Sequence, residues 1–279
     1  MFLQLEALYA CYSKREFVNP DPLQFLYDYP RLREREVVGL IASSLAYGGV
    51  KQILGSVKKA LDLMKPSPIE FLKSSDFGEI KQAFKDFKHR FAAGEDFSMM
   101  LWGVKRTIED LGSLEAAFMH GYEEKDETVL PALIRFTSTI RDRAREKNRS
   151  VKYGQGKVSY GFEHLIPYPE KRGASKRLHL FLRWMVRKDA VDPGGWKGIH
   201  PSKLIVPVDL HMHRIGLRLG ITERKQANLT TAMEITNAFR EIAPEDPVKY
   251  DFVLTRLGIR DDTDMDAFLS SCLMPQESA

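Results

Sequence analysis

The sequence predicts an all-α fold. Apolar side chains recur at intervals of three and four residues along most of the chain, which is the spacing of one face of an α-helix. Almost no stretch alternates apolar and polar residues over a useful length, as a half-buried β-strand does. With 279 residues and 43% hydrophobic side chains, the chain can form one large helical domain or two lobes.

The first half of the chain is divided into helices by proline and glycine. Three prolines between residues 20 and 30 interrupt the sequence after the first amphipathic segment, and Gly48-Gly49 separates the second helix from the third. Residues 65–100 contain a Lys-Pro-Ser-Pro sequence and phenylalanine-rich basic turns. We therefore expect helices at residues 2–12, 34–45, 50–64, 99–111, 114–122 and 128–145.

The second half begins with a basic, glycine-rich loop at residues 150–161. Beyond it, Asp209 precedes a helical pattern of apolar residues, so it is the expected N-cap of that helix or a close neighbour of the N-cap. Asn228 is an expected N-cap for the same reason, and Pro244 follows the end of its helix. The helices expected here lie at residues 175–187, after Asp209, at 229–242 and at 246–257.

Lys176 and Asp209 are the residues best suited to chemistry. Lys176 lies in the first turn of its helix, on a stripe that need not face the core, and the helix dipole there disfavours an ammonium. A lysine nucleophile needs such help, because an ordinary lysine pKa of about 10.4 leaves almost no free amine at neutral pH. A lysine can form a Schiff base with a substrate, and a carboxylate in contact with that lysine can take up and return the protons of the reaction. The plainer interpretation of Lys176 is a surface lysine at a helix start.

The motif around Asp209 resembles that of a known superfamily. Pro-Val-Asp-Leu-His-Met at residues 207–212 is similar to the Pro-Val-Asp-x-His-Met string of 8-oxoguanine DNA glycosylases and, more loosely, to the Val-Asp-Thr-His of endonuclease III. Both belong to the helix-hairpin-helix glycosylase superfamily. The 33 positions from Lys176 to Asp209 are a wide gap, similar to that in an archaeal branch of the 8-oxoguanine enzymes. The whole chain also resembles a bacterial family of unknown function.

The resemblance implies both an activity and an architecture. It implies a DNA glycosylase, with an AP-lyase step, that removes a damaged base such as an oxidised purine; Lys176 is then the nucleophile and Asp209 the assisting carboxylate. It also implies two lobes. Residues 1–36 and 205–279 form the first lobe, and residues 37–204 form a six-helix barrel that contains the hairpin. The active cleft is expected between the lobes.

The hairpin turn departs from the superfamily pattern. The usual Leu-Pro-Gly-Val-Gly is replaced by Ile-Pro-Tyr-Pro-Glu-Lys-Arg-Gly-Ala-Ser, which has one glycine, so fewer backbone amides are free to hold a phosphate. Lys171 and Arg172 are expected to make that contact through their charge instead. The DNA-binding residues expected from this turn and the helix after it are Lys171, Arg172, Gly173, Ser175 and Arg177.

Four further side chains are candidates for contact with the damaged nucleotide. Tyr47 lies where the superfamily has a residue that wedges into the base stack, so it can fill the gap left by a flipped base; the alternative is a tyrosine at the core edge. Trp196, after a glycine pair, is expected to line or support the base pocket, or simply to lie in a turn. His211, which corresponds to the histidine after the superfamily's catalytic Asp, and His179 are expected supports of the same pocket.

Positive charge is concentrated in one part of the sequence. Residues 141–188 contain 14 Lys and Arg against 4 Asp and Glu, a net charge of +10, although the whole chain carries only +4. Such a concentration is typical of proteins that bind a phosphate backbone. The plainer interpretation is a solvated helix face.

Two other functions stay open. Asp209, His211 and His213 form Asp-x-His-x-His, and on a strand all three would point the same way, as in a metal-dependent hydrolase. On a helix His211 points elsewhere, and no second cluster of His and Asp supplies further ligands, so no metal site is expected. The other alternative is a glycosylase-like fold that binds DNA without cutting it, because fold does not determine function.

The composition indicates the cellular compartment in which the protein is expected to work. No run of about 18 or more apolar residues occurs, so no transmembrane helix is expected, and the N-terminal residues lack the features of an export signal. Cys11 and Cys272 are too few for the four-cysteine iron–sulfur cluster of endonuclease III, and they indicate a reducing compartment. We expect a cytoplasmic, nucleoid-associated monomer that needs no cofactor, has no membrane partner and acts on double-stranded DNA.

Overall fold

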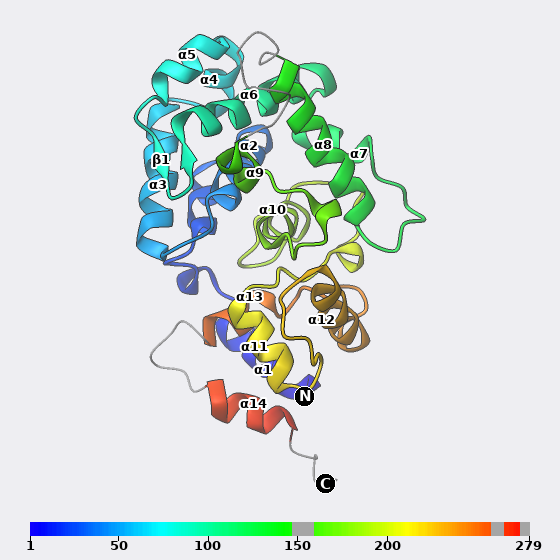
Figure 1. The fold of residues 1–279 in the computed structure, drawn as a ribbon. Helices are drawn as coiled ribbons and strands as arrows, with labels where there is room; N and C mark the ends of the chain where they lie inside the picture. Colours follow the sequence, from blue (N-terminus) through cyan, green and yellow to red (C-terminus); the bar gives the residue numbers. More distant parts are fainter. Residues whose placement is uncertain (147–158, 258–264, 274–279) are drawn as a thin grey trace. The chain divides into compact units, whose positions relative to one another are not determined.

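The computed structural model describes residues 1–146, 159–257 and 265–273. Within these ranges nearly all regular structure is helical, and the only strands are β1 (Lys88–His89) and β2 (Ala92–Ala93), which form one antiparallel pair (Figure 1). The prediction of an all-α fold is confirmed for this part of the chain. None of the described helices is long and apolar enough to cross a membrane.

The chain divides into two compact units, which are described separately. Unit 1 comprises Met1–Asn19, Arg172–Gly194 and Ile199–Ala279, and unit 2 comprises Pro20–Lys171 and Gly195–Gly198. The predicted lobe boundaries after residues 36 and 204, and the predicted cleft, stay predictions.

Unit 2 is built around α6 (Gly94–Leu111) and α8 (Leu130–Glu146), which pack side by side (Figure 1). Gly103 allows this approach, because a Cβ at this position would lie 2.4 Å from the carbonyl oxygen of Ile140. The other elements of unit 2 are η2 (Pro22–Asp28), α2 (Leu32–Ser44), α3 (Val50–Leu63), α4 (Pro68–Ser74), α5 (Phe77–Ala83), α7 (Leu114–Met119), α9 (Tyr160–Leu165) and η5 (Pro169–Lys171).

The short helices α4 and α5 lie in residues 65–100, where the sequence predicted turns. Both begin with a capping side chain. Ser67 accepts a hydrogen bond from the Glu70 amide, and Asp76 and Glu79 bond to each other's amides in a capping box. Helices of 7 residues are too short to show a clear period, so only these caps mark them in the sequence.

Unit 1 brings together segments that are far apart in the sequence. Its first helix, α1 (Phe2–Tyr12), packs against α13 (Asp251–Leu257) and α14 (Met265–Leu273), and α11 (Leu210–Arg218) also packs against α13. The remaining elements are η1 (Arg15–Phe17), α10 (Lys176–Val186), η6 (Pro201–Lys203) and α12 (Leu229–Ile242). The predicted bounds of α1 and α12 are confirmed, whereas α13 begins at Asp251 instead of at Asp246.

Beyond its first turn, α10 is buried on nearly all sides. The apolar side chains that the sequence predicted to face inward are buried, but His179, Arg183 and Arg187 are buried too. The polar stripe of this helix therefore lies inside the protein, and its charges must be balanced by partners from other segments.

Candidate active site

Lys176 and Asp209 meet at the starts of two helices of unit 1. Lys176 is the first residue of α10, and Asp209 is the N-cap of α11, where its Oδ1 accepts a hydrogen bond from the Met212 amide at 2.9 Å. The Nζ of Lys176 lies 3.0 Å from the Oδ2 of Asp209, and 33% and 23% of the two side chains are exposed. The structure thus brings the two predicted catalytic residues into direct contact while both stay accessible to solvent.

The surroundings of Asp209 favour its ionised form. Burial by itself would raise the pKa of Asp209, but the Lys176 ammonium, the Met212 amide and His211 together outweigh burial and lower the pKa below its ordinary value. Asp209 is therefore a carboxylate at neutral pH. A carboxylate in contact with an amine can stabilise positive charge nearby and can exchange protons with the amine.

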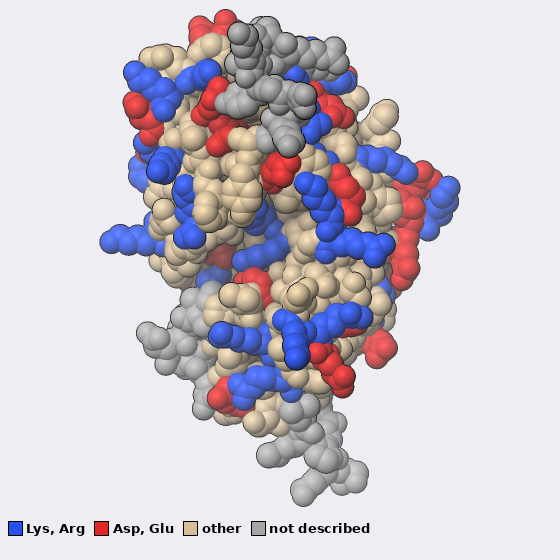
Figure 2. Space-filling model, viewed as in Figure 1, with Lys and Arg blue, Asp and Glu red and all other residues tan. Residues whose placement is uncertain are grey.

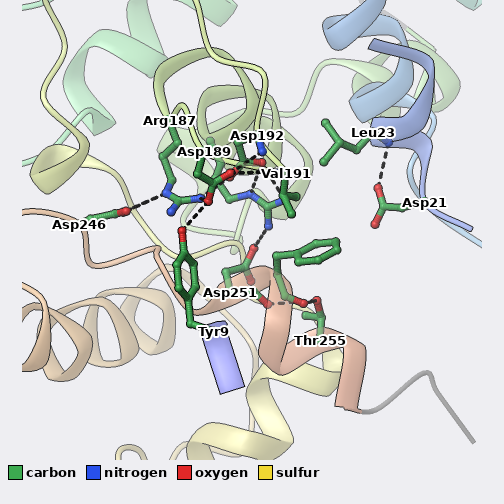
Figure 3. Close-up of polar contacts among 12 residues, drawn as sticks. Tyr9, Asp21, Leu23, Arg187, Asp189, Val191, Asp192, Asp246, Asp251 and Thr255 are labelled. Carbon is green, nitrogen blue, oxygen red and sulfur yellow. Dashed lines mark hydrogen bonds and ion pairs between the residues drawn. The ribbon is translucent and has the colours of Figure 1, made fainter. Parts of the chain in front are cut away.

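A cluster of buried ion pairs lies on the same face of α10 as Lys176. Arg183 and Arg187 follow Lys176 by seven and eleven positions, which is two and three helical turns. Only 4% and 5% of their side chains are exposed. Figure 3 shows acidic side chains that converge on Arg187 from several segments. The carboxylates of this arginine cluster belong to Asp189, Asp192, Asp246 and Asp251.

Asp192 joins the two arginines of the cluster. Its Oδ1 lies 3.2 Å from the Nε of Arg183, and its Oδ2 pairs with Arg187. Asp189 accepts hydrogen bonds from two amides of the loop after α10, at 2.8 and 2.7 Å, and from the Oη of Tyr9 on α1 at 2.8 Å (Figure 3). The cluster therefore ties α1 and this loop to the helix that positions Lys176.

The arginine cluster is a feature that the sequence reasoning missed. Charged residues on an amphipathic helix normally face solvent, so Arg183 and Arg187 did not suggest a buried site. One signal was available, because both arginines share the Lys176 face and an Asp-Ala-Val-Asp sequence begins two residues after Arg187. The two acids from around α13 give no local signal, since they are more than fifty residues away in the sequence.

Part of the basic stretch at residues 141–188 is engaged within the protein. Arg183 and Arg187 are paired with the carboxylates of the arginine cluster. In unit 2, Arg141 is 2% exposed and donates hydrogen bonds to the Pro167 carbonyl and to Glu170. Residues 147–158, which include most of the predicted glycine-rich loop, lie outside the described residues. On the face shown in Figure 2, Lys and Arg side chains are interspersed with Asp and Glu. Contact of this stretch with DNA stays a prediction for its exposed side chains.

The turn before α10, which contains most of the predicted DNA-binding residues, has an unusual backbone conformation. The φ angles of Arg172 and Ser175 are 60° and 45°, so two non-glycine residues adopt the left-handed conformation that glycine usually provides. Gly173 forms an isolated β-bridge with the residue before α12. Lys171 lies in unit 2, 3.6 Å from a glutamate of α9, whereas Arg177 belongs to the first turn of α10. Their contact with DNA stays a prediction.

Tyr47 is held in an aromatic cluster of unit 2. Its Oη donates a hydrogen bond to the His89 carbonyl at 3.0 Å, and its ring meets His89 and His164 edge-on. Phe91 stacks parallel to Tyr47 with ring centroids 6.4 Å apart. Phe91 and Tyr160 are 51% and 66% exposed, so these two rings are more accessible than Tyr47, whose wedge role stays a prediction.

The three predicted pocket residues lie in different surroundings. His179, on α10, is 1% exposed; neither ring nitrogen has a hydrogen-bond partner in the described structure, and burial lowers its pKa to about 4, so it is neutral at physiological pH. Trp196 is buried in unit 2, where its Nε1 donates to Glu36 at 3.1 Å and its ring packs on Phe118. Its role at a base pocket stays a prediction. His211 is partly exposed on α11.

Comparison with known proteins assigns the chain to a family. The family model described as "Protein of unknown function (DUF2400)" matches residues 21–260. The chain belongs to this family. The matched residues include both Lys176 and Asp209. A search of curated proteins and a search of solved structures each found no match.

In this DUF2400 protein the Asp-x-His-x-His sequence is helical. Asp209 caps α11, and His211 and His213 lie within the helix, so the strand that would point all three side chains the same way is not formed there. The Nε2 of His213 lies 2.7 Å from the Arg224 carbonyl oxygen. Among the residues that the structure describes, no three His, Cys, Asp or Glu side chains are grouped so as to hold a metal ion. No specific observation therefore favours the metal-hydrolase alternative.

Proposed function

We propose that this protein is a DNA glycosylase of base-excision repair, with AP-lyase activity, that acts on a damaged base through Lys176 and Asp209. The observation that carries the proposal is the 3.0 Å contact between the Lys176 Nζ and the Asp209 Oδ2. The resemblance of residues 207–212 to the motif of 8-oxoguanine DNA glycosylases supports the same pair, because it was identified independently of this contact.

In the proposed first step, Lys176 replaces the base at C1′ of a nucleotide that has left the helix stack. One proton leaves Nζ, and the freed lone pair forms the Nζ–C1′ bond. The glycosidic bond breaks with its electron pair on the base, which takes up a proton and departs. The ionised Asp209, 3.0 Å from Nζ, stabilises the positive charge that develops on the sugar.

The proposed lyase step uses the same lysine. Nζ, now bonded to C1′, loses a second proton; its lone pair then forms a C1′=Nζ double bond as the C1′–O4′ bond breaks, and O4′ takes up a proton. The protonated imine acidifies the proton on C2′. Removal of that proton forms a C2′=C3′ double bond and expels the 3′ phosphate with the electron pair of its C3′–O bond. Asp209 is the carboxylate that contacts Nζ and can exchange these protons.

Borohydride trapping on duplexes with different lesions tests the proposal, because borohydride reduces the imine to a stable covalent protein–DNA adduct. Wild-type protein should form the adduct on at least one lesion. Lys176→Gln should bind the same duplex and form none. Asp209→Asn keeps the amine and should react slower by roughly a hundredfold or more. An adduct formed by Lys176→Gln at the wild-type rate would place the nucleophile elsewhere.

Two variants serve as matched controls. Lys73→Gln removes an exposed lysine of α4, and Asp76→Asn removes an acidic N-cap in unit 2; both should form the adduct at the wild-type rate. The assay also separates the non-catalytic alternative. A wild-type protein that binds every duplex tested but forms no adduct would be a DNA-binding protein without this activity.

A further inference from the structure

A third carboxylate, Asp251, interacts electrostatically with both Lys176 and Asp209. Asp251 is the first residue of α13, which packs against α11, and its side chain is buried with 2% of the residue exposed. Its Oδ2 forms an ion pair with the Nη1 of Arg183, two turns along α10 from Lys176. Figure 3 shows Asp251 pointing from α13 toward the arginine cluster.

The second oxygen of Asp251 has no hydrogen-bond donor among the described residues. Its Oδ1 is buried and has no partner within the described structure. A buried carboxylate oxygen without a donor disfavours the charged form, because it has lost its water and gained nothing in return. Burial accordingly raises the pKa of Asp251 to about 6, although Arg183 acts in the opposite direction. Near neutral pH, Asp251 can therefore change its charge.

The charged groups around Asp251 come from three helices and one loop. Arg183 and Lys176 on α10 favour its ionised form, and the charge of Asp209 opposes it. Asp192, in the loop after α10, shares Arg183 with it. On α10, His179 is neutral. On α1, which packs against α13, Glu6 binds Lys249 and Tyr250, and Tyr9 binds Asp189.

Electrostatic coupling between two sites is reciprocal, so the charge of Asp251 also acts on Lys176 and Asp209. We propose that Asp251 is a positioning residue, which governs through its charge and its hold on Arg183 how readily Lys176 gives up its proton. Ionised Asp251 favours the Lys176 ammonium, and neutral Asp251 favours the free amine. The importance of Lys176 in this inference rests on the proposed function. The coupling between Asp251 and Lys176 does not itself require DNA.

Competitive acetylation of the DNA-free protein with acetic anhydride tests the coupling. Only the free amine reacts, so mass spectrometry of each lysine peptide from neutral pH to about pH 11 gives the pH at which half of that lysine is reactive. In Asp251→Asn, the midpoint for Lys176 should fall by roughly half a pH unit to one unit. Asp251→Glu keeps the charge and should retain the wild-type midpoint. Lys188 in the same chain is the internal control and should not change.

A merely structural role for Asp251 would alter stability without moving the Lys176 midpoint, and an unchanged midpoint in folded Asp251→Asn overturns the inference. If the variants do not fold, the coupling between Asp251 and Lys176 is measured in the wild-type protein. Carbon-13 NMR should show one titration step near pH 6 both at the Asp251 carboxyl carbon and at the Lys176 Cε, and none at the Lys188 Cε. No step at Lys176 would equally overturn the inference.

The proposed function and this inference can fail separately. Absence of a borohydride adduct with every lesion would reject the glycosylase activity, and the acetylation and NMR measurements would still show whether Asp251 controls Lys176. Conversely, an adduct that depends on Lys176, together with an unchanged Lys176 midpoint in Asp251→Asn, would retain the activity and reject only the role of Asp251.

Discussion

At the scale of single residues, Asp209 and Asp251 are two coupled carboxylates whose pKa values move in opposite directions. Burial raises the pKa of Asp251 to about 6, from an ordinary value of 3.8. A raised acid pKa means that the folded protein binds this proton more tightly, so the stabilisation is complete at low pH and is lost as the pH rises from about 4 to about 6. Over this window, the free energy of unfolding of the wild type should fall relative to that of Asp251→Asn, by at most about 3 kcal/mol. Urea unfolding at several pH values measures the difference, and parallel curves for the two proteins would contradict it.

At the scale of elements, α10 depends on the acids that balance its buried arginines. Asp192 contacts both Arg183 and Arg187, and burial raises its pKa against the opposing effect of the two guanidiniums. Asp192→Asn should remove the carboxylate that joins the two arginines in a buried site, and removal of one partner of a buried pair costs about 3–5 kcal/mol of unfolding free energy. Chemical denaturation monitored by circular dichroism measures this loss.

The matched control for Asp192 is Asp62, which also pairs with two cations, Lys58 and Lys65, but on the surface of unit 2. Asp62→Asn should be far milder, because solvent screens exposed pairs. Equal losses for the two variants would show that the arginine cluster does not stabilise α10 beyond an ordinary surface pair.

At the scale of the whole molecule, the proposed binding of DNA is a matter of charge. If Lys171 and Arg172 neutralise phosphates, changing both to Glu should weaken binding to all duplexes alike and reduce the slope of log affinity against log salt by about 1 for each phosphate that is no longer neutralised. Fluorescence anisotropy at several salt concentrations measures both quantities. Lys58→Glu with Lys59→Glu on α3 is the control pair, since it reverses two adjacent charges outside the turn. An unchanged affinity and slope in the Lys171 and Arg172 variant would exclude this turn from the DNA interface.

Much of the secondary structure could be predicted from the sequence, because its signals are local. The bounds of α1 and α12 and the capping role of Asp209 follow from apolar periodicity and from a side chain that can accept an amide hydrogen bond. The position of Lys176 at the first residue of α10 follows in the same way. The helices α4 and α5 were missed, since one or two turns do not establish a period.

The sequence by itself determined which residue types stand at the helix starts, whereas only the tertiary structure decided which of them meet. The 3.0 Å contact of Lys176 with Asp209 joins residues 33 positions apart, and the acids around α13 reach α10 from still farther away. Periodicity assigns a side chain to a face of its helix, but it does not say what covers that face. Arg183 and Arg187 are buried because distant carboxylates converge on them, and this balance of charge and burial exists only once unit 1 has folded.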